Sequence, residues 1–170
     1  MVAGIQILEK FSEILNAEFS AGVSPDTWGA LHLRIGSDRQ LSISPSPDQN
    51  DLVFSAVLLE LDRPTDTVMF TAALACNLHQ EKTCGGAVGL DAEHQALVYS
   101  WRVPTDQVDP AMLLVCLHNF SETADSLAQD IRTASEELTP EERDQIEQAL
   151  DRRGEPSSLS ERYLGHAPIF

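Results

Sequence analysis

The sequence predicts an α+β fold in which one mostly antiparallel, five-stranded sheet is packed by helices. Two observations lead to this class. Segments typical of strands, most of them alternating apolar and polar residues, come as a group of three and a group of two. Stretches with helical character precede, separate and follow these groups, so the expected order is α-β-β-β-α-β-β-α.

The first element, residues 5–19, has the spacing of an amphipathic helix. Its apolar residues recur at three- and four-residue intervals, at Ile5, Leu8, Phe11, Leu15 and Phe19, and Ile7 and Ile14 widen the stripe. Charged and polar residues such as Glu9 and Glu13 occupy the other side. Gly22 and Pro25 then end the helix.

Three strands are expected next. Residues 31–35 and 41–44 alternate apolar and polar side chains, which predicts strands with one wet face, and residues 36–38 form the turn between them. Residues 52–61 are nearly all apolar. Such a run is typical of a central strand that is covered on both faces.

A second helix and two more strands follow. Residues 67–79 carry almost no charge, so most of this helix should be buried in the core and in an oligomer interface. Residues 87–90 and 96–103 read as strands joined by a turn. Tyr99 and Trp101 share one strand face, where core packing is the first interpretation and a hydrophobic ligand groove the second.

A long helix opens at Asp109 as the cap and Pro110 as the first helical residue. Its apolar stripe predicts packing on the domain's own sheet, with a coiled coil as the second interpretation, and comprises Leu113, Leu117, Phe120, Ala124, Leu127, Ile131, Ala134 and Leu138. Thr139 to Glu142 is a capping box that starts another helix. We therefore expect one domain over residues 1–138 and a C-terminal helix with a flexible tail over 139–170.

Charge and composition argue against several classes of function. The 170-residue chain has a formal net charge of −16, which opposes binding to nucleic acid and to anionic lipid. No run reaches the roughly 18 apolar residues of a membrane span, and the N-terminus lacks the features of a signal peptide. The three cysteines, Cys76, Cys84 and Cys116, fit reduced thiols in a cytoplasm.

The sequence contains only weak matches to metal-binding, phosphate-binding and catalytic motifs. Cys76, His79 and Cys84 offer three ligands where structural zinc needs four, and the Gly85-Gly86-x-x-Gly89 segment lacks the Lys-Ser/Thr ending of a phosphate loop. No catalytic residue, metal or cofactor is therefore predicted. Paired carboxylates among the many acidic residues leave a small carboxylate-based enzyme as an alternative.

One stretch resembles the CesT-like (Tir chaperone) family of type III secretion chaperones, over roughly residues 3–136. The resemblance lies in the segments 73–78 (ALACNL), 83–91 (TCGGAVGLD), 97–104 (LVYSWRVP) and 108–113 (VDPAML). In this stretch Asn77 is expected to cap the orphan carbonyls of a helix end or to adopt the left-handed conformation. Gly85 and Gly86 are expected to permit a close approach to the next strand, and Gly89 to mark a bulge or a close neighbour.

The resemblance implies a non-enzymatic, cytoplasmic homodimer without a cofactor. Such a dimer would bind the N-terminal segment of a secreted effector, keep it soluble and deliver it to the export apparatus, with the secretion ATPase as a further partner. A regulatory adaptor of the same fold that binds another cytoplasmic protein is the runner-up.

Two sets of site residues follow from these expectations. The expected effector-binding residues are Leu8, Phe11, Ile14 and Leu15 on the first helix and Leu31, Leu33, Ile35, Leu41 and Ile43 on the first two strands, which could also offer a sheet edge. The expected dimer contact, which the family places on the second helix and the strand after it, comprises Val68, Phe70, Leu74, Leu78, Val88 and Leu90.

Overall fold

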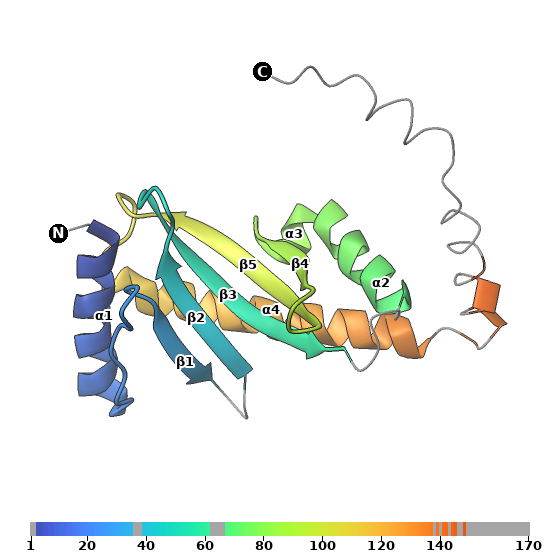
Figure 1. Cartoon of the computed structure of the whole chain (residues 1–170), viewed down its shortest axis with the longest axis horizontal. Coiled ribbons are helices and arrows are strands. Elements are labelled where there is room, and N and C mark those ends of the chain that lie inside the picture. The colour runs from blue at the N-terminus through green and yellow to red at the C-terminus, as the bar shows by residue number, and fades with distance from the viewer. Residues whose placement is uncertain are drawn as a thin grey trace, which may run out of the picture.

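The computed structural model describes residues 3–35, 39–61 and 67–137, together with positions 139, 141, 142, 144, 145 and 148. The expected order of elements is confirmed, with one short additional helix, α3 (Figure 1). The elements are α1 (Ala3–Phe19), β1 (Leu31–Ile35), β2 (Arg39–Pro45), β3 (Asp51–Glu60), α2 (Thr67–Leu78), α3 (Gln80–Thr83), β4 (Ala87–Asp91), β5 (Ala96–Pro104) and α4 (Met112–Glu136).

The five strands form one antiparallel sheet in the order β1-β2-β3-β5-β4. Strands β1 and β4 are therefore its two edges. The expectation that residues 41–43 could offer an edge is wrong, because β2 pairs with β1 on one side and with β3 on the other. Leu41 and Ile43 consequently lie inside the sheet.

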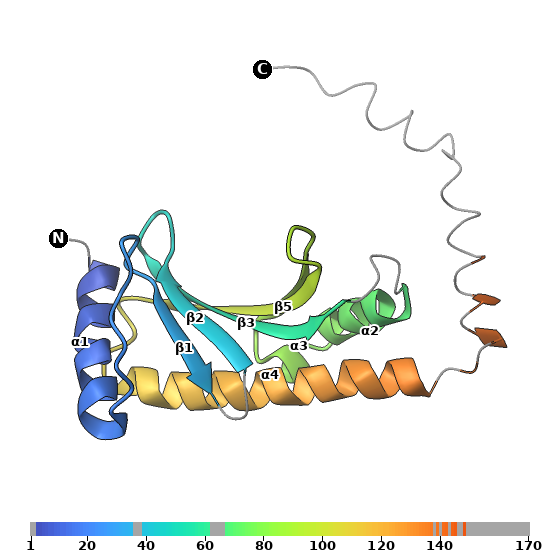
Figure 2. The same cartoon turned by 60° about the horizontal axis from the view of Figure 1, so that its bottom comes forward.

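Helix α4 runs along one face of the sheet, and α1 stands across the end near β1 (Figure 2). The opposite face carries no helix within the described residues. Strand β3 shows the consequence, since Leu52, Phe54 and Ala56 are buried while Val53 and Ser55 between them stay half-exposed. The expectation that this strand is covered on both faces is wrong for the single chain.

Aromatic rings join the sheet to α4. Phe120 on α4 stacks on Tyr99 of β5 with ring centres 4.8 Å apart and lies 5.5 Å from Phe54 of β3. The Tyr99 hydroxyl donates to the Thr83 carbonyl at 2.7 Å, and burial raises the pKa of Tyr99 to about 12. Core packing, the first interpretation for Tyr99, is thus the one observed.

Helix α4 begins at Met112 with Ala111 as its N-cap, two residues later than expected, so Pro110 is not its first residue. Asp109 Oδ1 still accepts from the Met112 N–H at 2.7 Å. The stripe faces the chain's own sheet, with Leu113, Phe120 and Leu127 fully buried. The capping box is also present, since Glu142 Oε2 accepts from the Thr139 N–H at 2.9 Å. Leu138 and most of the expected C-terminal helix and tail lie outside the described residues.

The glycines of the motif segment behave differently from one another. A Cβ on Gly86 would stand 2.6 Å from the Ser100 carbonyl oxygen and 2.5 Å from a Tyr99 ring carbon, so the expected close approach is confirmed there. Gly89 pairs regularly with Val98 and has nothing within 4 Å of an added Cβ, so the bulge or close neighbour expected there is wrong. The sheet's irregularity lies instead in β3, between Val57 and Leu59.

Candidate binding surfaces

An apolar groove lies between the end of α1, strand β1 and the first half of α4. It has a volume of about 520 Å³. Its large apolar side chains come from three separate elements and are Leu15, Phe19, Leu33, Ile35, Leu114 and Leu117. Three exposed charged or polar residues, Arg34, His118 and Glu122, also line it. A mostly apolar groove with a few polar side chains is suited to an apolar side chain from another molecule.

The structure divides the expected effector-binding residues into two groups. Leu15, Leu33 and Ile35 line the groove, and Ile14 is half-buried on α1. The other five side chains lie in the core of the chain itself: Leu8, Phe11, Leu31, Leu41 and Ile43. The binding role of the whole set stays a prediction. Leu15, Leu33 and Ile35 line this groove, and Leu41 lines a separate hollow on the open face of the sheet.

Three large apolar residues of the groove were not predicted from the sequence to bind a partner. Leu117 belongs to the stripe of α4 that the sequence assigned to packing on the sheet or to a coiled coil, and Leu114 lies outside that stripe. Phe19 ends the apolar stripe of α1, and 63% of its surface is exposed. A large aromatic residue at the end of a stripe, just before the helix stops, is the signal that could have indicated a surface role.

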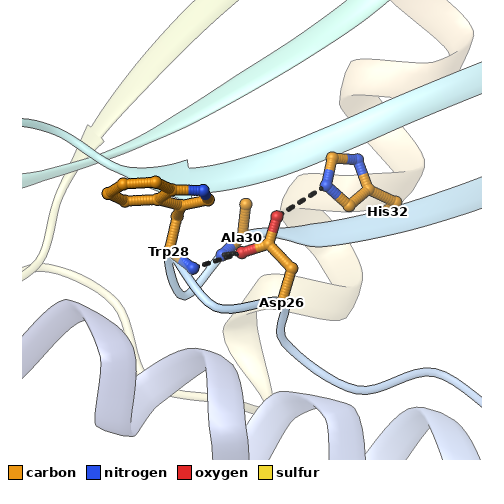
Figure 3. Close-up of polar contacts among 4 residues, drawn as sticks. All are labelled: Asp26, Trp28, Ala30 and His32. Carbon is orange, nitrogen blue, oxygen red and sulfur yellow. Dashed lines mark hydrogen bonds and ion pairs between the residues drawn. The ribbon is translucent and has the colours of Figure 1, made fainter.

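A hydrogen-bonded turn places a tryptophan just before the edge strand β1. Asp26 Oδ1 accepts from the main-chain N–H groups of Trp28 and Ala30 at 2.8 and 2.9 Å, and Oδ2 lies 3.0 Å from His32 Nε2. Figure 3 shows this carboxylate between the Trp28 main chain and the His32 ring. Trp28 itself is 84% exposed, so a fixed main chain holds an uncovered indole.

The same contacts perturb the acidity of Asp26. Its pKa is lowered, mainly by the hydrogen bond from the Ala30 N–H and then by the His32 side chain and the Trp28 N–H. Each of these interactions favours the charged carboxylate. The turn that positions Trp28 is therefore built around an ionised Asp26.

The open face of the sheet forms a second, more polar hollow of about 560 Å³. His32 and Arg34 of β1 lie at one side and Asp91 of β4 at the other. Across its middle, Ser42 pairs with Ser55 and Ser55 with Ser100, so short hydroxyl side chains follow one row through three strands. The lining of this hollow is accordingly more polar than that of the groove.

Exposed leucines cluster where α2 meets β4. Leu74 and Leu90 are more than half exposed, and Leu78 is 82% exposed. The other expected dimer residues are less available, since Phe70 is half-buried and Val68 and Val88 lie in the core of the single chain. Uncovered leucines on adjoining elements are typical of a protein–protein contact. The dimer itself stays a prediction.

Asn77, expected to cap the end of α2, instead holds the main chain of β4. Its Nδ2 donates to the Val88 carbonyl at 2.8 Å, and its Oδ1 accepts from the Val88 N–H at 2.7 Å. Asn16 of α1 holds Val23 by the same pair of bonds, both 2.8 Å long. The Asn77 expectation was wrong because tertiary contact supplied a partner eleven residues away.

Metal and membrane sites are not indicated in the part of the chain that the structure describes. Those residues contain no group of three or more His, Cys, Asp or Glu side chains placed to hold a metal ion. Burial raises the pKa of the Cys76 thiol, which opposes the thiolate form that binds metals. None of the described helices is long and apolar enough to cross a membrane.

Two solved structures share the fold. The ExsC–ExsE complex matches with a TM-score of 0.64 at 14% identity, over 76% of this chain and 96% of that chain. The Yersinia pestis type III secretion chaperone SycH, in complex with a stable fragment of YscM2, matches with a TM-score of 0.53 at 17% identity, over 73% and 98%. At these identities the likeness establishes the fold.

Sequence comparison gives the family. No curated protein sequence matches the chain. The model of the Tir chaperone protein (CesT) family, however, matches residues 6–128, from the first helix into the second half of α4. Since that match spans well over half of the sequence and agrees with the resemblance in the motif segments, the chain belongs to the Tir chaperone protein (CesT) family.

Proposed function

We propose that this protein is a type III secretion chaperone that acts as a cytoplasmic homodimer. It binds the N-terminal segment of one or more effector proteins, keeps that segment soluble and competent for secretion, and delivers it to the export apparatus and its ATPase. The observation that carries the proposal is the apolar groove between α1, β1 and α4, which remains open after the chain's own core is complete.

The groove and the neighbouring sheet edge suit an extended polypeptide. Leu33 and Ile35 belong both to the edge strand β1 and to the groove lining. A segment that pairs with β1 can therefore place alternate side chains against the groove, as in other strand-addition complexes. Exposed Trp28, fixed just before β1, is positioned as an aromatic anchor for the same segment.

Burial and charge supply the energetic reason for binding. Covering apolar surface on both molecules contributes about 25 cal/mol per Å², offset by the ordering of the bound segment. The net charge of −16 keeps a complex with an aggregation-prone segment soluble. Family membership and the likeness to SycH, crystallised with a fragment of YscM2, support a protein partner.

The test is co-expression with the N-terminal regions of candidate effectors encoded beside this gene. We expect a stable complex by size-exclusion chromatography with light scattering, and export of that effector to depend on the chaperone. Phe19→Asp should weaken the complex by roughly tenfold or more, because it puts a charge into the groove. Val115→Asp, an equally drastic change at an exposed residue of α4 outside the groove lining, is the matched control.

Two outcomes would contradict the proposal. Equal losses in the Phe19→Asp and Val115→Asp variants would show that the groove is not the binding site. A bound partner that stays in the cytoplasm would make the protein a regulatory adaptor of the same fold.

A further inference from the structure

The sheet has two edges, and at one of them, β4, the chain's own residues already bind main-chain groups. Strand β1 ends the sheet on one side and β4 on the other. An edge strand presents main-chain N–H and C=O groups that another strand can pair with. Which edge accepts a strand therefore depends on what already occupies these groups.

On β4, the side chain of Asn77 occupies them at Val88. The two bonds, 2.7 and 2.8 Å long, engage both the N–H and the C=O of a single residue. This is the pattern with which a residue of a neighbouring strand would exchange hydrogen bonds in an antiparallel ladder. The amide of Asn77 thus substitutes for one residue of an added strand.

The neighbouring position is also occupied by the chain itself. In an antiparallel strand, alternate residues direct their main-chain groups away from the paired strand, so Val88 is followed by Leu90 and preceded by Gly86. The Gly86 N–H donates to the Thr83 carbonyl at 2.8 Å, immediately before β4 begins. Of these three positions, Leu90 alone has no such contact described, and one position is too short a ladder for strand addition.

We infer that Asn77 is the residue that closes the β4 edge to strand pairing. A partner at the surface around α2 and β4 then makes side-chain contacts, through Leu74, Leu78 and Leu90. A strand that pairs with the sheet binds at β1 instead. The inference that a pairing strand binds at β1 rests on the proposed function. The closure of β4 does not, because it follows from the contacts of Asn77 alone.

Amide hydrogen exchange measured by NMR tests the closure without any partner. In the wild-type protein, the Val88 N–H should exchange at least about tenfold more slowly than an exposed loop amide. In Asn77→Ala it should lose that protection, while the amide of Tyr99 on the neighbouring strand keeps its own. A Val88 amide that exchanges as fast as the loops in wild type overturns the inference, even if Asn77→Ala does not fold.

Assembly provides a readout that loss of stability alone would not change. Sedimentation velocity should show larger, concentration-dependent species for Asn77→Ala, and adding Ala87→Lys should remove them, because lysine on an edge strand opposes pairing. Asn16→Ala is the matched control, since it deletes the same two bonds to Val23, a residue that belongs to no strand. Unchanged assembly in Asn77→Ala, or the same large species in Asn16→Ala, would refute the inference.

A bound effector segment, once identified, tests whether a pairing strand binds at β1. Its binding should protect amides of β1 and leave those of β4 unchanged. Protection along β4 would overturn the inference, whereas failure to find any effector would count against the proposed function and leave the Val88 measurement unaffected.

Discussion

Arg39 at the start of β2 is tied to Asp125 in the middle of α4 by two hydrogen bonds to one oxygen. Nη2 and Nε of Arg39 donate to Asp125 Oδ1 at 2.6 and 2.9 Å. A third bond runs from Arg39 Nη1 to the Val57 carbonyl at 2.8 Å, beside the bulge in β3. The arginine is 15% exposed and the aspartate 66%, so the two partners have unequal surroundings.

This inequality predicts unequal costs of substitution. Arg39→Met removes the donor to the Val57 carbonyl as well as the ion pair, and should lower the free energy of unfolding by about 1–3 kcal/mol. Asp125→Ala removes a partner in an exposed pair and should cost about 0–1 kcal/mol. Urea denaturation of both variants checks the difference, and equal costs would show that the Val57 contact contributes nothing.

Gly86, just before β4, and Gly89, within β4, make a matched pair of positions for substitution. Gly86→Ala should destabilise the protein by about 2 kcal/mol or more, because its Cβ would stand 2.6 Å from a main-chain oxygen that cannot move freely. Gly89→Ala has open space and should change stability by less than about 1 kcal/mol. Thermal denaturation of both variants measures the two costs. A larger loss of stability in Gly89→Ala than in Gly86→Ala would contradict this prediction.

The Asp26 turn should weaken in acid. Because the folded state lowers the pKa of Asp26 from its ordinary value of 3.8, the ionised carboxylate stabilises the fold above that pH. The contribution disappears as the pH falls from 3.8 through the lower folded pKa. Unfolding free energies of wild type and Asp26→Asn, measured from about pH 6 to about pH 2.5, should differ by a constant amount at first and converge in acid. A difference that stays constant throughout would contradict this origin.

Leu74→Asp should convert the expected dimer into a folded monomer. Leu74 is exposed on α2 in the single chain, so the substitution costs little within the fold but places a charge in an apolar contact. Light scattering gives the mass and circular dichroism checks the fold. Met112→Asp, a similar change at an exposed residue of α4, should leave the dimer intact. A dimeric Leu74→Asp variant would show that the contact lies elsewhere.

The division into a domain of residues 1–138 and an extension of 139–170 can be tested by truncation. The family match ends at residue 128, and the described core is complete by Ile131 of α4. A chain that ends at residue 138 should therefore unfold cooperatively with a midpoint close to that of the full chain. Loss of cooperative unfolding would place part of the extension in the core.

Local sequence patterns were sufficient to predict the five strands and the three long helices of the described residues: alternation or helical spacing for most of them, and nearly unbroken apolar runs for β3 and α2. Alternation as in Leu31, Leu33 and Ile35 reflects which side chains face the core, and that information lies within five residues. The β3 bulge escaped prediction because Val57, Leu58 and Leu59 are apolar in any register. The Asn77 contact escaped it because its partner was fixed by how α2 packs beside β4.

Surface sites were predicted less well for a related reason. Apolar side chains mark a face that will be covered, but the sequence does not say whether the cover comes from the same chain. Leu31 and Ile43 are covered by their own chain, whereas Leu78, equally apolar, faces solvent. Phe19 and Trp28 could have been noticed as large aromatics next to breaks in secondary structure.

The chain contains two tryptophans, and they lie in different surroundings, so intrinsic fluorescence can report on each of them. Trp28 stands in water, while Trp101 is half-buried with its ring 5.5 Å from that of Phe54. Their emission spectra should therefore be separable, and a Trp101→Phe chain would emit from Trp28 alone. Any molecule that covers the start of β1 would shift that emission to shorter wavelength, so occupancy can be followed without a label.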